Sequence, residues 1–306
     1  MGLLDGKVAI VTGAGHGIGR GHALELAKEG ATVLVNDLGV TLAGEARDGE
    51  GRAADLTVEL IESRGGAAAA NYEDVADVEG AARMVAQAIE LFGHLDIVVN
   101  NAGIARDATI WGMTESDWDS VIRVHLKGTF APTQAAIRHW RELNKAGQDV
   151  SSGRIINTTS GAGLVGNFGQ ANYTAAKAGI AAFTQTVSLE VFKIGVTVNC
   201  IGPAGATRMA ASIPGAGIEA KEADEFTEWN RMDPSLASPL VAWLASDKAA
   251  HVTGQIIRAV GDEIVLMNGW SNGNTIRKPE KRWEASELTA LMNADVFHSR
   301  APGLRY

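Results

Sequence analysis

The sequence predicts a doubly wound α/β fold, in which helices cover both faces of one mostly parallel sheet. Short runs rich in Val and Ile alternate along the chain with longer helical patterns, and Gly or Asn bounds each run. Parallel strands require crossover connections, which are usually helical and right-handed, so this alternation favours a sheet between two helical layers. The first run also leads through a Gly-rich turn into a helix. The expected strands are Lys7–Thr12, Ala31–Asn36, Leu95–Asn100, Arg154–Thr158, Val196–Cys200 and, last, Gln255–Val260.

Helical patterns separate these strands. Helices are expected at Leu56–Arg64, Val78–Phe92, Asn172–Lys193 and Pro234–Ala245. The Gly-rich segment Leu38–Gly51 is interpreted as an inserted loop. Composition changes after Gly261, and no long linker or internal repeat divides the chain. We therefore expect one domain over residues 1–260 and a C-terminal extension over residues 261–306 that packs on this domain or forms a lid.

Composition excludes several classes of protein. The chain has 306 residues, 46% of them hydrophobic, which is enough for a large buried core. A net charge of −9 argues against a nucleic-acid binder, because such proteins usually carry a basic surface. The single cysteine excludes an internal disulfide framework, and the seven scattered histidines lack the spacing of a metal site. Because no signal peptide or membrane span is recognised, we expect a protein of the cytoplasm.

A glycine-rich turn joins the first strand to the first helix. It reads Thr12-Gly13-Ala14-Gly15-His16-Gly17-Ile18-Gly19. Glycine lets the backbone turn tightly and approach a pyrophosphate at the N-terminus of a helix. A Gly-rich turn without a ligand is the alternative, but a position between a strand and a helix favours a dinucleotide. The candidate cofactor residues here are Gly13, Gly15, His16, Gly17, Ile18 and Gly19.

Asp37 ends the second strand, eighteen residues after Gly19. A carboxylate at this place can accept hydrogen bonds from the adenosine ribose, whereas it would repel a 2′-phosphate. Twelve acidic residues and four arginines lie between Asp37 and Glu90, so this segment carries a charge of 4 − 12 = −8. A solvated aspartate at a strand end is the alternative interpretation. The sequence therefore favours NAD over NADP.

Three polar residues in the second half of the chain point to acid–base chemistry. Tyr173 and Lys177 are four residues apart on an expected helix, so they share one face, and Ser160 follows a strand thirteen residues earlier. Tyrosine has an ordinary pKa of about 10, and a nearby ammonium favours its phenolate. The serine hydroxyl could then bind the substrate oxygen while the tyrosine moves its proton. Each residue alone could be structural; together they indicate an oxidoreductase rather than a non-catalytic NAD-binding scaffold.

These motifs resemble those of the short-chain dehydrogenase/reductase family over Lys7 to Val260. The resemblance includes the TGAGHGIG turn, Asp74-Val75, Asn100-Asn101-Ala102-Gly103, Ser160 and the YTAAK stretch from Tyr173 to Lys177. It implies a Rossmann-type fold with seven strands and a catalytic, NAD-binding domain over residues 1–260. It also implies that Asp74 and Val75 lie near the adenine, that Asn101, Ala102 and Gly103 line the cofactor, and that Tyr173 and Lys177 contact it. Such enzymes are usually homodimers or homotetramers, paired through helices here at Asp119–Leu143 and Asn172–Lys193.

The sequence departs from the family pattern at two places. His125, in VHLKGTF, stands where the family often has an asparagine that helps a proton relay. A histidine could relay protons, or it could equally be a hydrogen-bonded helix residue. After the sixth strand, the usual Pro-Gly stretch becomes Pro203-Ala204-Gly205-Ala206-Thr207, in which Pro203 and Thr207 match the family's cofactor contacts.

The stretches VNDLG, ANYEDV, VHLKGTF and GNFGQANYTAAK resemble the dehydrogenase part of peroxisomal multifunctional β-oxidation enzymes and their stand-alone bacterial relatives. This resemblance implies NAD-dependent oxidation of (R)-3-hydroxyacyl-CoA to 3-ketoacyl-CoA, from a fatty acid or a sterol side chain. A 17β-hydroxysteroid dehydrogenase or a general ketone reductase of the same family is the alternative. The ending Leu304-Arg305-Tyr306 is not a peroxisomal address, so a bacterial cytoplasm is expected.

A basic segment in the extension offers contacts for an acyl-CoA. Arg277, Lys278, Lys281 and Arg282 precede Trp283, and the whole stretch from 277 to 282 carries a charge of +3. Either this segment or Arg208 could meet the phosphates or adenine of CoA. A solvated basic surface is the simpler alternative, because runs of charge usually face solvent.

Overall fold

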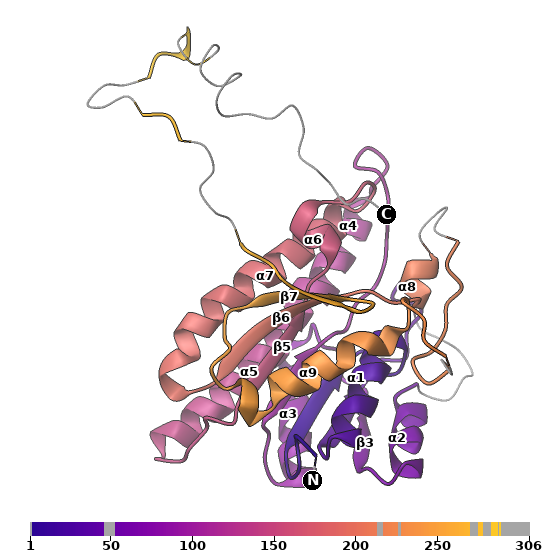
Figure 1. Cartoon of the computed structure of the whole chain (residues 1–306), viewed down its shortest axis with the longest axis vertical. Coiled ribbons are helices and arrows are strands. Elements are labelled where there is room, and N and C mark those ends of the chain that lie inside the picture. The colour runs from indigo at the N-terminus through magenta and orange to yellow at the C-terminus, as the bar shows by residue number, and fades with distance from the viewer. Residues whose placement is uncertain are drawn as a thin grey trace.

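Eight strands form one sheet in the computed structural model of the chain, in the order β3-β2-β1-β4-β5-β6-β7-β8 (Figure 1). The strands are β1 (Val8–Thr12), β2 (Thr32–Asn36), β3 (Ala68–Asn71), β4 (Ile97–Asn100), β5 (Arg154–Thr158), β6 (Thr197–Pro203), β7 (Ile256–Val260) and β8 (Glu263–Leu266). The first seven pair in parallel, and β8 runs antiparallel to β7. The structure describes residues 2–45, 53–212, 217–225, 228–269, 275–277, 283–286 and 288.

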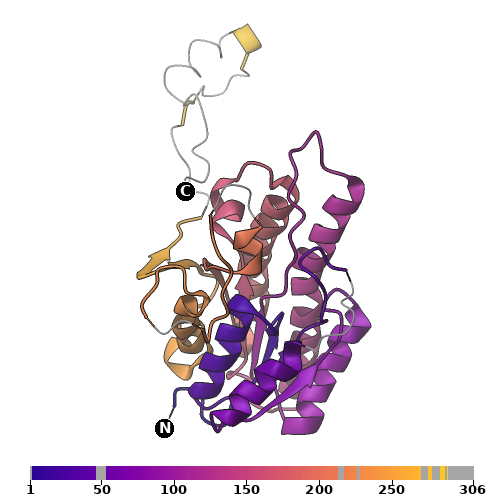
Figure 2. The same cartoon turned by 90° about the vertical axis from the view of Figure 1, so that its right-hand side faces the viewer.

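Two layers of helices cover the sheet. α1 (Gly17–Lys28), α2 (Ala53–Ser63) and α9 (Ser238–Ala245) pack on one face, and α3 (Val78–Phe92), α5 (Gly128–Lys145) and α7 (Ala171–Val191) pack on the other. Shorter helices are α4 (Glu115–Ile122), α6 (Gly161–Val165), α8 (Arg208–Ala211), and the 3-10 turns η2 (Phe192–Ile194), η3 (Pro234–Ala237) and η4 (Asp247–Ala249). Figure 2 shows α1 and α9, from opposite ends of the chain, side by side on their face. Within the described ranges, every helix is too short or too polar to cross a bilayer.

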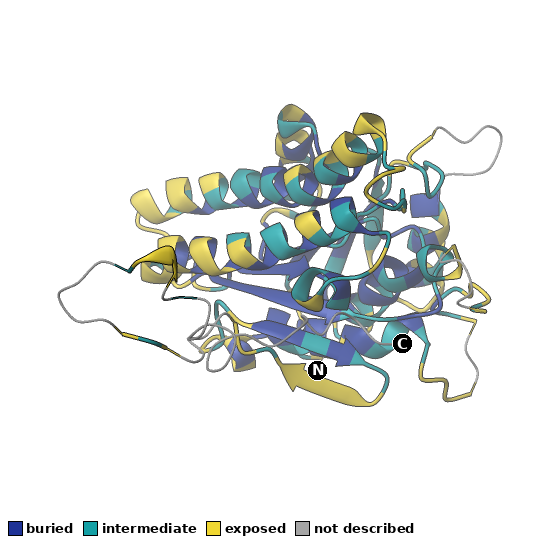
Figure 3. Ribbon diagram, turned by 90° about the horizontal axis from the view of Figure 1, so that it is seen from above, coloured by how far each residue is buried: buried dark blue, intermediate teal, exposed yellow. Residues whose placement is uncertain are grey.

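The two buried faces explain why the strands read as continuous apolar runs. In β1, Ala9 and Val11 belong to the core under α1 and α9, whereas Val8 and Ile10 belong to the core under α3 and α5. Successive side chains of a strand point to opposite faces, so a strand covered on both sides needs apolar residues at every position. The central strands are accordingly buried along their length (Figure 3).

Helix ends follow local signals in the sequence. Asp77 accepts hydrogen bonds from the backbone N–H groups of Glu79 and Gly80, so it caps α3. Gly93 ends the same helix with a φ of 89°, a left-handed conformation that favours glycine. Thr114 and Asp117 form a reciprocal capping box at the start of α4. A π-helical turn, η1 (Arg123–Lys127), joins α4 directly to α5.

The expected doubly wound fold is confirmed, with differences in the strand count. The six strands expected from sequence patterns are all present; five lie within two residues of their expected bounds, and β6 extends three residues beyond the expected end at Cys200. The strand pattern missed β3, because its sequence Ala-Ala-Ala-Asn carries no β-branched residue, although the family resemblance implied seven strands. The eighth strand, β8, lies inside the expected C-terminal extension and joins the sheet through the tight turn at Gly261, whose φ is 60°. Residue 260 is therefore not a boundary of the sheet.

A buried histidine links the first helix to the C-terminal part of the fold. His22 in α1 is fully buried, and its Nδ1 lies 2.9 Å from the hydroxyl oxygen of Ser238, which is also buried. Burial lowers the pKa of His22 to about 3. The unfolded chain binds a proton at this side chain below a pH of about 6.5, whereas the folded chain excludes it until a much lower pH. The contribution of the neutral His22 to the free energy of unfolding is therefore complete above pH 6.5, and it is lost progressively as the pH falls below that value.

We predict that His22→Asn weakens the acid sensitivity of the fold. Asparagine keeps a hydrogen-bonding group for Ser238 but does not titrate. Below pH 6.5 the wild-type free energy of unfolding should fall by roughly 1 kcal/mol more per pH unit than that of the variant. Urea unfolding at pH 7.0, 6.0 and 5.0 measures this difference. Parallel pH profiles for the two proteins would contradict the role assigned to His22.

Candidate functional site

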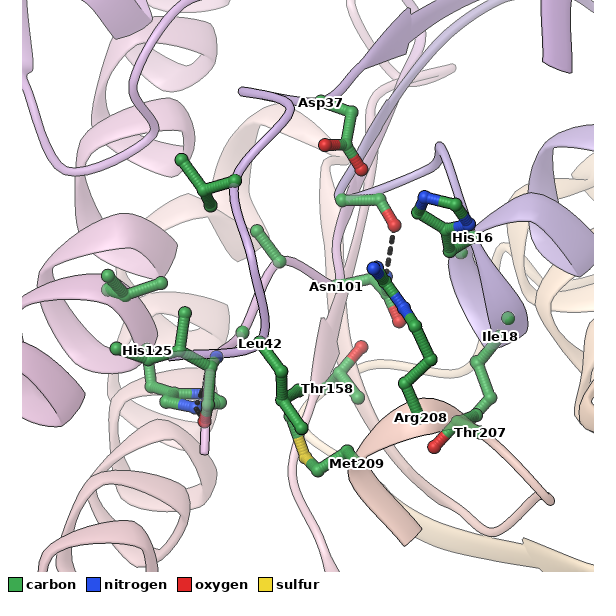
Figure 4. A pocket seen from close by; sticks show the side chains of 18 of the residues that line it. His16, Ile18, Asp37, Leu42, Asn101, His125, Thr158, Thr207, Arg208 and Met209 are labelled. Carbon is green, nitrogen blue, oxygen red and sulfur yellow. Dashed lines mark hydrogen bonds between the residues drawn. The ribbon is translucent and has the colours of Figure 1, made fainter. Parts of the chain in front are cut away.

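A cavity of about 430 Å³ opens at the carboxyl ends of the parallel strands. It lies where the strand order reverses, because the chain moves from β1 outward to β3 and then returns to β4 on the other side of β1. Ligands of open α/β sheets bind at such a switch point. Figure 4 shows Asp37 and His16 toward one end of the cavity, and His125 toward the other.

The glycine turn forms one wall of this cavity. Gly13 and Gly17 have φ values of 62° and 51°, a region that favours glycine. A Cβ on Gly13 would lie 2.7 Å from Cα of Ala102, and one on Gly19 would lie 2.1 Å from the carbonyl oxygen of Gly13. The turn therefore needs glycine for close backbone packing, and the first residues of α1, Gly17 to Gly19, line the cavity.

Asp37 is held in place at the end of β2 by two backbone hydrogen bonds. Its Oδ2 accepts from the N–H of Gly15 at 3.0 Å, and its Oδ1 accepts from the N–H of Gly39 at 2.8 Å. Each carboxylate oxygen keeps a further lone pair, so Asp37 can still accept hydrogen bonds from a ligand. Among the described lining residues, its neighbours Leu38 and Val40 carry no charge. Asp37 therefore offers hydrogen-bond acceptors at this end of the cavity.

Thr12 fixes the segment that follows β4, a role that the sequence analysis missed. Its Oγ1 accepts from the backbone N–H groups of Asn101 at 3.0 Å and of Ala102 at 3.2 Å. The side-chain amide of Asn101 donates to the carbonyl oxygens of Thr12 and Gly13. This contact could not be predicted from the position of Thr12 at the end of a strand, because the contact depends on the pairing of β1 with β4.

Tyr173 and Lys177 face the same cavity from the first turns of α7. Lys177 is buried, its Nζ donates to the carbonyl oxygen of Thr158 at 2.7 Å, and Nζ lies 5.7 Å from the centre of the Tyr173 ring. Burial lowers the pKa of Lys177 to about 8. Asn172 anchors this helix start, because its amide donates to the carbonyl oxygens of Arg106 and Asp117.

Ser160 lies beside the cavity rather than among its lining residues. It is the N-cap of α6, where its Oγ accepts from the N–H of Ala162 at 3.3 Å. The two preceding residues, Thr158 and Thr159, line the cavity. Gly15 is likewise absent from the lining, since its N–H group turns to Asp37.

His125 comes from the π-helical turn and is buried. Its Nε2 lies 2.8 Å from the carbonyl oxygen of Ile104, and its ring meets the ring of Tyr173 edge to face at a centroid distance of 5.1 Å. Burial, together with the positive charge of Lys177, lowers the pKa of His125 to about 3. Of the two interpretations left open by the sequence, these surroundings favour a neutral, hydrogen-bonded helix residue over a protonated relay.

The remaining candidate residues also border the cavity. These are His16, Ile18, Asp74, Val75, Gly103, Pro203 and Thr207. The carboxylate of Asp74 forms an ion pair with Arg123, which the sequence analysis did not single out. Thr207 caps α8, with its hydroxyl accepting from the N–H of Ala210 at 3.2 Å.

Arg208 and the basic segment 277–282 are the residues considered above for contacts with an acyl-CoA. Arg208, one of the residues considered for an acyl-CoA, lines the cavity. Of the basic segment, Arg277 is exposed, whereas Lys278, Lys281 and Arg282 lie outside the described residues.

The site thus joins a glycine turn at a helix N-terminus, the carboxylate of Asp37 and a tyrosine–lysine pair in one cavity. Residues 7–214 match the family described as short chain dehydrogenase. The chain belongs to this family. A crystal structure of a short chain dehydrogenase from Mycobacterium avium is 48% identical and superposes with a TM-score of 0.84, covering 95% of each chain.

Curated relatives of this short-chain dehydrogenase confirm the narrower resemblance. The chain is 41% identical over 303 residues to hydroxyacyl-CoA dehydrogenase ChsB1 of Mycobacterium tuberculosis, covering 98% of this chain and 91% of that protein. It is 42% identical over 257 residues to peroxisomal multifunctional enzyme type 2 of Drosophila melanogaster. That alignment covers 84% of this chain and 39% of the larger protein.

As a short-chain dehydrogenase, the protein is an oxidoreductase that acts on CH–OH groups, and its family uses nicotinamide cofactors. The cavity fits such a dinucleotide. Gly13, Gly17 and Gly19 of the glycine turn line the cavity, and Asp37 lines it as well. A helix N-terminus for phosphate groups therefore stands beside a carboxylate for ribose hydroxyls.

We predict that Gly103→Ala destabilises the protein through a clash with His125. A Cβ at position 103 would lie 2.3 Å from Cε1 of His125, so the buried ring or the backbone at position 103 would have to shift. The expected loss is about 1–3 kcal/mol of unfolding free energy, the usual range for overpacking.

A double-mutant cycle with His125→Asn, measured by urea unfolding, checks this contact. The smaller side chain should relieve the clash, so the double variant should lose less stability than the sum of the two single losses. Additive losses would show that Gly103 and His125 do not constrain each other.

Proposed function

We propose that this short-chain dehydrogenase oxidises (R)-3-hydroxyacyl-CoA to 3-ketoacyl-CoA with NAD. The proposal rests on one arrangement: Tyr173 and Lys177 face the same cavity whose far end carries Asp37. The similarity to a hydroxyacyl-CoA dehydrogenase along nearly the whole chain supports the substrate class. The substrate loses a proton from its hydroxyl oxygen and a hydride from the carbon that bears it. A bound nicotinamide would supply the acceptor for this hydride.

Tyr173 is the proposed general base. Its phenolate takes the hydroxyl proton of the substrate, and Lys177 favours this phenolate through its positive charge on the same helix face. The buried ammonium has three N–H donors, and one of them is used by Thr158. The others are available to the ribose next to the nicotinamide, so Lys177 would both orient the cofactor and assist Tyr173.

Ser160 is the proposed donor to the substrate oxygen. Its hydroxyl oxygen accepts a hydrogen bond from the backbone N–H of Ala162. This contact does not use the hydroxyl proton, which can therefore be donated to the substrate oxygen. His125 is the proposed positioning residue, because its neutral ring packs against Tyr173 and bonds the backbone at Ile104. The remaining proposed cofactor contacts are those of the glycine turn, Asp74, Val75, Asn101, Ala102, Gly103, Pro203 and Thr207.

Turnover by the purified protein tests the function. NADH formation is measured with the R and S enantiomers of 3-hydroxyacyl-CoA esters of several chain lengths, with NADP in place of NAD, and with a 17β-hydroxysteroid. We expect turnover of the R thioesters with NAD. Tyr173→Phe should lower kcat by ~10²–10⁴-fold, the usual contribution of a general acid or base, while the dissociation constant of NADH stays within a factor of two or so.

Other outcomes of this assay are equally informative. Oxidation of the steroid alone would keep the chemistry and assign the alternative substrate. Full activity of Tyr173→Phe would remove Tyr173 from the mechanism.

We predict that Asp37→Asn weakens the preference for NAD over NADP. The substitution removes the negative charge that would repel a 2′-phosphate and keeps one of the two oxygens, so one of the two backbone contacts, with Gly15 or with Gly39, is retained. The ratio of kcat/KM for NADP to that for NAD should rise about tenfold, which corresponds to about 1.4 kcal/mol.

Glu59→Gln is the matched control for this comparison. Glu59 is exposed on α2 and lies outside the cavity, and its substitution changes the net charge by the same amount. An unchanged ratio in Asp37→Asn, or an equal rise in Glu59→Gln, would contradict the assignment of Asp37.

A further inference from the structure

A carboxylate of the chain itself already binds the glycine turn. Glu222 lies in the segment 217–225, and its side chain is 22% exposed at the edge of the cavity. Its Oε2 accepts from the backbone N–H of Gly17 at 2.5 Å, and its Oε1 lies 2.7 Å from Nδ1 of His16. Glu222 therefore occupies the first N–H group of α1, the kind of group that binds anions at a helix N-terminus.

The surroundings of Glu222 stabilise its negative charge. Burial raises the pKa of this carboxyl, but the hydrogen bonds from His16 and Gly17 and the charge of Arg20 outweigh that effect and hold the pKa below its usual value. The guanidinium of Arg20 lies 3.9 Å from Oε2 and also donates to the carbonyl oxygen of Gly15. Glu222 is thus a charged carboxylate that contacts the same glycine turn as the proposed cofactor.

A second acidic residue fastens the same segment to α1. Asp224 pairs with Arg20 at 3.2 Å, and Ala223 between the two acids is buried against Gly21. The backbone N–H of Lys221 donates to the carbonyl oxygen of Ala206. Because these neighbouring contacts do not involve the Glu222 carboxylate, that side chain can turn away from Gly17 while the segment stays in place.

We propose that Glu222 is an internal competitor of the dinucleotide cofactor, holding the Gly17 N–H group until a phosphate group of the cofactor displaces it. A phosphate and the carboxylate are both anions, and one N–H group cannot serve both. The charge of Glu222 thereby weakens binding of the phosphate-bearing cofactor and speeds its release. This inference rests on the proposed dinucleotide cofactor, but it does not depend on the proposed substrate.

Direct binding of nucleotides to the Glu222→Gln protein tests the competition. The probes are NADH, followed by its own fluorescence, and ADP-ribose and adenosine, each titrated as a competitor of NADH. Glutamine has the size of glutamate without its charge. We expect NADH and ADP-ribose to bind about tenfold more tightly to the variant, a change of about 1.4 kcal/mol. Adenosine lacks phosphates, so its inhibition constant should stay the same.

Glu219→Gln is the matched control, because Glu219 is exposed in the same segment and its loss changes the net charge equally. It should bind all three probes as the wild type does. Glu222→Ala provides a second variant in which both the charge and the acceptor are gone, and it should behave like Glu222→Gln.

The possible failures are separable. Equal or weaker binding of NADH by both Glu222 variants would overturn the competition while leaving the proposed function intact. A parallel gain for adenosine would also overturn it, since a general opening of the cavity would then explain the change. If neither the wild type nor the variants bind NADH, the proposed cofactor fails and the competition fails with it.

Discussion

One hydroxyl group holds the two halves of the site together. Thr12 ends β1, and its Oγ1 accepts the backbone N–H groups of both Asn101 and Ala102, which follow β4. These two strands flank the point at which the order of the sheet reverses. The glycine turn follows β1 directly, so the contact fixes the distance between the proposed phosphate end and the segment leading to the proposed chemical end. Gly13 packs against Ala102 at the same junction, which leaves no room for a larger residue at position 13.

A buried positive charge imposes the second constraint. Removing an ammonium from water is costly, and for Lys177 the cost is expressed in a pKa lowered to about 8. The protein offsets part of this cost with the carbonyl oxygen of Thr158, at the end of β5. The same desolvation makes the charge act more strongly on its neighbours, because little water screens it. The charge of Lys177 also lowers the pKa of His125, so it acts together with burial to keep the imidazole neutral.

The sequence predicted those features that depend on local pattern. The buried strands were evident because they are rich in Val and Ile, and the pair Tyr173–Lys177 was evident because a helix places residues four apart on one face. β3 left no such pattern, since three of its four residues are alanine. Glu222 lies 206 positions from His16, and only the completed fold brings them to 2.7 Å. The neutral state of His125 likewise depends on burial, which a single side chain in a sequence does not reveal.

The π-helical turn between α4 and α5 has a consequence for the spacing of residues along this part of the chain. In a regular α-helix, residues two positions apart point in nearly opposite directions, because each residue advances the helix by about 100°. Arg123 and His125 nevertheless both border the cavity, one paired with Asp74 and the other packed on Tyr173. A π-helical turn holds about one residue more than an α-helical turn, so it offsets the faces of α4 and α5 by about one residue, or roughly 100°, relative to a continuous helix. Loss of a single residue between positions 123 and 127 would remove this offset and rotate α4 relative to α5 by roughly 100°, so the length of this stretch is constrained as well as its composition.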